Sequence, residues 1–260
     1  MVGCNYESHL LIGDFYFENV LLFFLFFDKI IIGWWEVVNV KKRDILVSLF
    51  VVVLYFLWPY ILSAVNSFFN LSDLITLYIS FSVNFVFLFI VLYIYRNLIN
   101  ESFGKLKKGK KENLVLSIKI FLVGLAIYTI LSILLGALNI PISNNQVSMK
   151  EIMKKIPIIF VLNTLFYYPI IEELVFKLSF KDILKNKWSF IIITGIFNAL
   201  FQIVFSFGNI TDLLYLLPYS IFFSTLSYIY YKTNNIIYPI FLRICYNLIP
   251  CIIVIRNLLH

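Results

Sequence analysis

Two adjacent glutamates, Glu172 and Glu173, are the residues of this sequence with the clearest chemical potential. They lie inside an apolar stretch, IPIIFVLNTLFYYPIIEELVFKLSF, that is long enough to cross a bilayer. A charged side chain at membrane depth costs at least about 2.5–3.5 kcal/mol, so such residues are usually there for a function or for a charged partner. A carboxylate in this setting could act as a general base. The pair therefore marks a candidate functional site.

The spacing around the two glutamates predicts how they are used. Neighbouring side chains on a helix diverge by about 100°, so we expect that the two cannot serve the same partner. Glu173 and Lys177 are four residues apart with the acid first, which favours an ion pair along the helix. Glu172 would then face the interior of the protein. Pro169, just upstream, removes a helix hydrogen bond and could kink the span at the site.

A second polar pair, Arg243 and Asn247, lies in the last apolar stretch, IYPIFLRICYNLIP. The two residues are four apart and share one helix face. An arginine at this depth must pair or reach the membrane surface. Glu172 is its most attractive partner, because a buried carboxylate and a buried guanidinium each need a counter-charge. Structural ion pairing and catalysis both remain open as roles for these charges.

The other polar residues carry weaker signals. Asn198 and Gln202 are also four apart, and amides on one face of a membrane helix more often join helices than perform chemistry. The two histidines, His9 and His260, lie at opposite ends of the chain and outside any apolar stretch. The three cysteines form no CxxC pair, so neither a disulfide framework nor a zinc cluster is predicted.

Composition indicates an integral membrane protein with an all-α fold. Hydrophobic residues make up 62% of the 260-residue chain and charged residues 13%, against about 25% charged in soluble domains. We predict a polytopic bundle of seven to eight transmembrane helices over residues 45–260, preceded by an N-terminal segment, 1–44. Residues 18–40 either span the membrane or lie at its surface. The seven predicted spans are roughly 45–66, 74–96, 114–138, 156–178, 188–207, 212–231 and 236–257.

The net charge of +7 does not predict a nucleic-acid partner, because the basic residues cluster between the apolar spans. If residues 41–44 are cytoplasmic, the cytoplasmic segments carry 13 basic residues and the opposite side four. This asymmetry predicts the orientation of the chain. The strongest charge run, KLKKGKK at 105–111, would contact membrane lipid, and we interpret it as a topology signal.

Three motifs resemble a known family. The runs YYPIIEELVFK, GIFNALFQIVF and YKTNNIIYPIFLRICYN resemble, in order and spacing, the bacterial CPBP family of CAAX-protease and bacteriocin-processing membrane proteins, also called Abi proteins. The resemblance covers about residues 115–250. It implies a multi-pass protein of a bacterial cell membrane and the fold of an intramembrane endopeptidase.

The motifs depart from the family pattern at the histidines. The first motif, EExxxR, reads EELVFK, with Lys177 in place of arginine. The second, FxxxH, ends here in Phe205. The third, HxxxN, has Arg243 in the histidine position and retains Asn247. In active members, the resemblance implies that the first glutamate and the second-motif histidine activate water, while the third motif supports the oxyanion. By this correspondence the candidate catalytic residues are Glu172, Glu173, Arg243 and Asn247.

Without either motif histidine, we predict no metal and no cofactor, because one Glu and one Asn are too few ligands for zinc. Phe205 cannot accept a proton, and an arginine beside Glu172 would weaken it as a base. We therefore predict a non-catalytic scaffold, regulator or bacteriocin-immunity-type factor that binds another membrane protein or a peptide. The alternative is an active endopeptidase with Glu172 as base and Arg243 and Asn247 as oxyanion donors. A transporter ranks behind both, since no internal repeat is apparent.

Overall fold

The computed structural model describes residues 42–69, 73–108, 111–204 and 208–259. Within these ranges every regular element is a helix and no strand occurs. The possible span at 18–40, both histidines and Phe205 lie outside the described residues. The division of the chain at residue 44 therefore stays a prediction.

Six helical segments are long and apolar enough to cross a membrane. A seventh helix, α12 (Ile237–Leu259), contains a shorter apolar stretch, Ile237–Ile252. Each of the seven predicted spans coincides with one of these helices, so a multi-pass helical membrane bundle is confirmed. The six segments are α2 (Lys42–Phe69), α3 (Asp73–Ile94), α5 (Lys111–Ala137), the composite Pro157–Ser179, α10 (Lys187–Val204) and the stretch Ile210–Thr233, which joins η4 (Ile210–Tyr215) to α11 (Leu216–Thr233).

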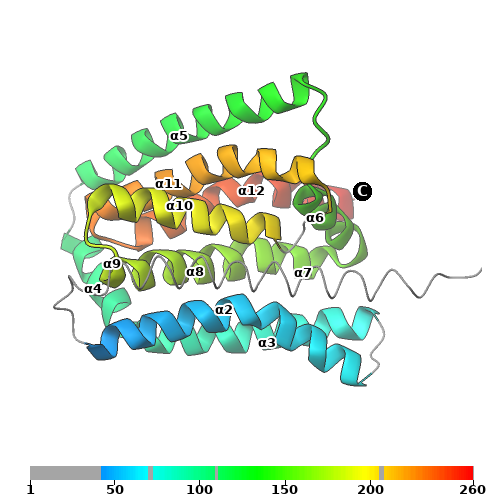
Figure 1. The fold of residues 1–260 in the computed structure, drawn as a ribbon, viewed down its shortest axis with the longest axis horizontal. Helices are drawn as coiled ribbons and strands as arrows, with labels where there is room; N and C mark the ends of the chain where they lie inside the picture. Colours follow the sequence, from blue (N-terminus) through cyan, green and yellow to red (C-terminus); the bar gives the residue numbers. More distant parts are fainter. Residues whose placement is uncertain (1–41, 70–72, 109–110, 205–207, 260) are drawn as a thin grey trace, which may run out of the picture. The chain divides into compact units, whose positions relative to one another are not determined.

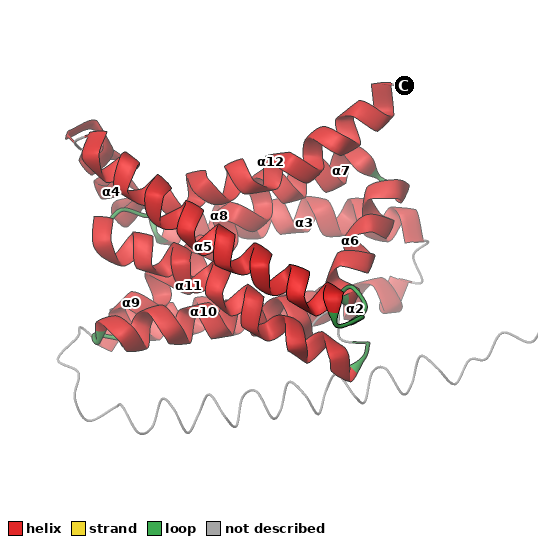
Figure 2. Cartoon of the chain, turned by 90° about the horizontal axis from the view of Figure 1, so that it is seen from above, coloured by secondary structure: helices red, strands yellow, loops and turns green. Residues whose placement is uncertain are grey.

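Two further helices connect the spans. The helix α4 (Arg96–Lys108) follows α3, and α6 (Asn144–Lys155) precedes the composite span. The sequence did not predict them, because both are rich in polar residues and neither contains a bilayer-length apolar run. In both views the helices α4 and α9 (Phe180–Ile183) lie at one end of the bundle, and α6 lies at the other end with the C-terminus (Figures 1 and 2).

The helices α10 and α11 share the most extensive helix–helix contact of the described bundle, and they lie side by side in Figure 1. Their approach depends on Gly195, where an added Cβ atom would lie 2.8 Å from the backbone nitrogen of Ser224 and 2.9 Å from the carbonyl oxygen of Ser220. Small residues at such contacts are typical of membrane helices, since they let two backbones come close. The other face of α11 packs on α5 through an apolar core that includes Phe121 and Phe222.

The composite span is not a continuous α-helix. It consists of α7 (Pro157–Leu162), the π-helical turn η2 (Asn163–Tyr167), α8 (Tyr168–Glu173) and the π-helical turn η3 (Leu174–Ser179), and α9 follows it. The π turn η2 ends two residues before Pro169, and the kink that the sequence predicts at this proline stays a prediction. Such turns are rare and occur often at functional sites. They place both glutamates on a short α-helical segment between two irregular turns.

Candidate functional site: a buried charge cluster beside an aromatic cavity

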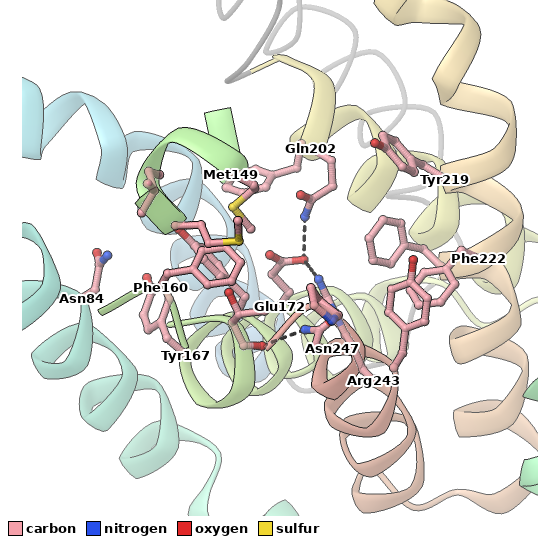
Figure 3. Close-up of a pocket in the computed structure, with 18 of the residues that line it drawn as sticks. Asn84, Met149, Phe160, Tyr167, Glu172, Gln202, Tyr219, Phe222, Arg243 and Asn247 are labelled. Atoms are coloured by element: carbon pink, nitrogen blue, oxygen red, sulfur yellow. Dashed lines mark hydrogen bonds and ion pairs between the residues drawn. The ribbon is translucent and has the colours of Figure 1, made fainter. Parts of the chain in front are cut away.

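Glu172 of α8 meets Arg243 of α12 in the interior of the bundle (Figure 3), and Glu173 contacts the same arginine. Glu172 and Glu173 are 1% and 0% exposed, and Arg243 is 5% exposed. The Nη2 group of Arg243 donates to Oε2 of Glu172, and its Nη1 group donates to Oε1 of Glu173 at 3.1 Å. The predicted pairing of Glu172 with Arg243 is therefore confirmed.

The expectation that the two glutamates cannot share a partner is wrong. Arg243 contacts both of them because a guanidinium is a planar fork with separate terminal nitrogens, and each nitrogen can reach a different carboxylate. The arginine also approaches from a neighbouring helix, so it is not limited to one face of α8. The divergence of adjacent side chains on a helix therefore does not prevent one arginine from contacting both carboxylates.

The predicted ion pair along the helix is also present. Nζ of Lys177 lies 3.2 Å from Oε2 of Glu173, and both side chains are fully buried. Two acids and two bases thus compensate one another. We refer to these four residues as the charge cluster: Glu172, Glu173, Lys177 and Arg243. Burying a charge costs several kcal/mol unless a partner offsets it, so this mutual neutralisation accounts for their burial.

One aromatic ring faces both cations of the charge cluster. The ring centroid of Phe223, on α11, lies 4.9 Å from Cζ of Arg243 and 5.9 Å from Nζ of Lys177. Cations are attracted to the faces of aromatic rings, and the attraction is stronger where water is excluded. Phe223 therefore links the charge cluster to α11, while the ion pairs of Arg243 link α12 to α8.

The amide pair of α10 is used unequally. Nε2 of Gln202 donates to Oε2 of Glu172 at 2.9 Å, which joins α10 to α8 as expected. Asn198 is fully buried, but its side-chain amide has no hydrogen-bond partner among the described residues. Only Gln202 therefore has the helix-joining hydrogen bond that the sequence predicts for both.

Asn247 has a structural contact that follows from Pro169. The backbone N–H of Tyr168 donates to the carbonyl of Asn163 in the π turn. The next i−5 hydrogen bond would run from residue 169 to Thr164, but proline has no N–H. Nδ2 of Asn247 instead donates to the carbonyl oxygen of Thr164 at 2.7 Å. The asparagine thus supplies the donor that the proline removes, and it fixes α12 to the π turn.

Glu172, Arg243 and Asn247 line a cavity of about 750 Å³ (Figure 3). The helix α6 contributes Met149 and Lys150 to its wall. Apolar cavities with a few convergent polar groups are the usual form of ligand sites. The sequence did not predict the aromatic wall of this cavity, because its aromatic residues come from separate helices without a local motif. These aromatic residues are Tyr55, Trp58, Tyr128, Phe160, Tyr167, Tyr168, Phe201, Tyr219, Phe222, Phe223 and Tyr246.

The donor set of this site does not fit a zinc ion. Within the described ranges, no three or more His, Cys, Asp or Glu side chains gather as metal ligands. Both carboxylates of the charge cluster are bonded to cationic side chains. Lysine and arginine are not zinc ligands in proteins, which use Cys, His and carboxylates. The prediction that the protein binds no metal stays a prediction.

Fold and site together define a multi-pass helical membrane protein with a buried polar centre. Residues 154–249 match the family model of the type II CAAX prenyl endopeptidase Rce1-like proteins, a segment that contains the whole charge cluster, Gln202 and Asn247. The match confirms the resemblance indicated by the motifs: this segment is an Rce1-like segment of the CPBP family. No curated protein and no solved structure matches the chain significantly.

Proposed function

We propose that this protein is a non-catalytic member of its family, a pseudoprotease that binds a peptide or part of another membrane protein in the aromatic cavity. The observation that carries the proposal is the position of Arg243. It stands where the family motif has a histidine, and it bonds both glutamates. In this proposal the charge cluster has a structural role, in which it stabilises the wall of a binding cavity.

A general base must be able to accept a proton from water within hydrogen-bond reach. Oε2 of Glu172 already accepts hydrogen bonds from Arg243 and Gln202. A water that uses this oxygen as its base would therefore have to displace one of these two donors. The sequence supports the same conclusion, because Phe205 stands in the place of the second-motif histidine and a hydrocarbon ring cannot transfer a proton.

The cavity supports a binding role. Its volume of about 750 Å³ is in the range of ligand pockets, and aromatic rings make up much of its wall. Met149 and Met153 lie on one side, and methionine side chains adapt to partners of different shape. As part of the proposal, the protein works in a bacterial cell membrane as a scaffold, a regulator or a bacteriocin-immunity-type factor.

A protease assay tests the absence of catalysis. The purified full-length protein is incubated in nanodiscs with prenylated CAAX-type and leader-type peptides, and the products are measured by mass spectrometry. We expect no cleavage above that of the peptides alone. Cleavage by the wild-type protein that disappears in Glu172→Ala would overturn the proposal.

Binding of the same peptides tests the cavity. Met149→Trp narrows the cavity and should weaken peptide binding, measured by fluorescence anisotropy, by about tenfold or more, which is about 1.4 kcal/mol. Leu138→Trp is the matched control, because Leu138 is 70% exposed and lies outside the cavity. Equal affinities for the two variants would count against the cavity as the binding site.

The second candidate function is an active endopeptidase. It is favoured by the fact that Glu172, Arg243 and Asn247 line one cavity, so that a bound peptide would meet a carboxylate and two donors. Both donors, however, already have partners: Arg243 bonds the glutamates and Asn247 bonds the carbonyl of Thr164. Catalysis would require these contacts to open when substrate binds.

A further inference from the structure

Two lysines from separate segments of the chain, one on α4 and one on α9, contact the residue that ends α11. Nζ of Lys105, on α4, donates to the carbonyl oxygen of Asn234 at 3.3 Å. Nζ of Lys181, on α9, donates to the side-chain oxygen of the same asparagine. Asn234 ends α11 with φ of 48°, a left-handed conformation that asparagine tolerates better than most residues. Two cations from distant segments thus meet at one turn.

A second pair of lysines, Lys187 and Lys232, lies beside the ring of Tyr228 on α11. Nζ of Lys187 lies 5.2 Å and Nζ of Lys232 lies 5.8 Å from the ring centroid of Tyr228. Lys187 also lies 4.4 Å from the Trp188 ring, and the Trp188 side chain is 60% exposed. Tyrosine, tryptophan and lysine are the side chains that proteins place at headgroup level. We call the four lysines the lysine cluster: Lys105, Lys181, Lys187 and Lys232.

The described acids offset only part of this positive charge. Glu101 forms an ion pair with Lys105 at 2.6 Å. The hydrogen bond and the charge of Lys105 hold the pKa of Glu101 below its ordinary value, and Lys181 contributes in the same direction. Among the described side chains, no carboxylate lies within ion-pair distance of Lys187 or Lys232. Lys187 and Lys232 therefore carry positive charge that no described carboxylate offsets.

The helix α4 connects two spans, so we expect it to lie at a membrane surface. It lies between the spans α3 and α5, and its apolar side chains Leu98 and Phe103 are 40% and 49% exposed. Nδ2 of Asn235 donates to the carbonyl oxygen of Ser102 at 2.8 Å, which ties α4 to the turn between α11 and α12. A helix with polar and apolar faces beside a span typically lies in the interface, with its lysines at the headgroups.

We propose that the lysine cluster binds the headgroup of an anionic phospholipid. Basic residues beside a span attract anionic lipid. Lys187 of α10 and Lys232 of α11 lie beside the same ring, so a headgroup bound there would connect these two helices. The site is separate from the aromatic cavity and does not depend on the function proposed for that cavity.

The test compares two double variants of the full-length protein with equal changes in charge. Lys187→Gln/Lys232→Gln removes half of the lysine cluster, and Lys154→Gln/Lys155→Gln removes two exposed lysines of α6 at the other end of the bundle. Each protein is placed in phosphatidylcholine nanodiscs with and without phosphatidylglycerol. Retained lipid is counted by native mass spectrometry, and the midpoint of thermal unfolding is measured.

We expect phosphatidylglycerol to raise the unfolding midpoint of the wild-type protein and of the α6 variant. The Lys187→Gln/Lys232→Gln variant should lose this shift and retain phosphatidylglycerol about tenfold more weakly. An equal response of both variants would overturn the proposal, because lipid binding would then follow net charge alone. The same stabilisation by free glycerol phosphate would also overturn it, in favour of a soluble phosphate ligand. If the double variant does not fold, the single variants Lys187→Gln and Lys232→Gln provide the same comparison.

Discussion

At the scale of single residues, Arg243 determines the character of the site. It neutralises one glutamate and shares the other with Lys177, so the charge cluster is balanced only when all four side chains are present. A buried ion pair adds little net stability compared with apolar residues, but removal of one partner leaves an uncompensated buried charge. The cluster should therefore be sensitive to single substitutions and tolerant of paired ones.

Arg243→Gln tests this balance directly. It leaves two carboxylates with one lysine, and we expect the free energy of unfolding to fall by about 3–5 kcal/mol. Adding Glu172→Gln restores neutrality, so the double variant should be more stable than Arg243→Gln alone. Unfolding in mixed micelles, followed by circular dichroism, measures both. Arg256→Gln, an exposed arginine of the same helix, is the control and should change little. Additive losses in the double variant would contradict the predicted coupling.

Two of the ion pairs in the charge cluster were predictable from the sequence. Spacing predicted the pair of Glu173 with Lys177, and the need of a buried arginine for a counter-charge predicted Glu172 as its partner. The sequence did not predict that Arg243 reaches both glutamates, because this depends on where α12 lies relative to α8. The partner of Asn247 is a backbone carbonyl, which no side-chain motif reveals.

At the scale of elements, the π turn η2 depends on a proline and an asparagine that are far apart in the sequence. Asn247→Ala leaves the carbonyl of Thr164 without its donor, and we expect a loss of about 1–3 kcal/mol in the free energy of unfolding. Pro169→Ala returns a backbone N–H to the position that could donate to this carbonyl. The double variant should therefore lose less than the sum of the two single variants.

The free energy of unfolding of these variants is measured by circular dichroism in mixed micelles. Asn100→Ala, on the exposed side of α4, is the control. If Asn247→Ala costs no more than this control, the tie between α12 and the π turn has no energetic role. A double variant with fully additive effects would show that Pro169 and Asn247 act separately.

The contact between α10 and α11 gives a prediction about glycine. Gly195→Ala would bring a methyl group within 2.9 Å of backbone atoms of α11, which can relieve the contact only by moving the helix. Such overpacking costs about 1–3 kcal/mol. Gly136→Ala in α5 is the matched control, because its Cβ would meet nothing within 4 Å. Thermal unfolding should show destabilisation by the first substitution and unchanged or slightly raised stability for the second.

Whether the sequence predicts a helix depends on how local the sequence pattern of that helix is. The long apolar runs predicted all six bilayer-length segments and the helix α12, because an apolar run of about 20 residues is rare outside a membrane helix. The helices α4 and α6 were not predicted, since polar residues interrupt their apolar positions and neither forms a continuous run. The π turns were not predicted either. The side chain that bonds the Thr164 carbonyl of η2 comes from the distant helix α12, which no local pattern reveals.

At the scale of the whole molecule, the distribution of basic residues fits one orientation. The segments around α4 and α9 and the end of α11 carry the lysine cluster, and α6 lies at the other end of the bundle (Figure 1). The positive-inside rule places the richer end in the cytoplasm. A lipid bound to the lysine cluster would then belong to the cytoplasmic leaflet, where anionic headgroups attract basic segments.

This orientation predicts which residues a reagent can reach from outside the cell. The three native cysteines are replaced by alanine, and a single cysteine is introduced as Lys107→Cys after α3 or as Lys154→Cys in α6. A membrane-impermeant maleimide added to intact spheroplasts should label Lys154→Cys and spare Lys107→Cys, which should react only after permeabilisation. The opposite pattern would reverse the orientation. Labelling of both from outside would mean that α5 does not cross the membrane, because α5 is the only described span between the two positions.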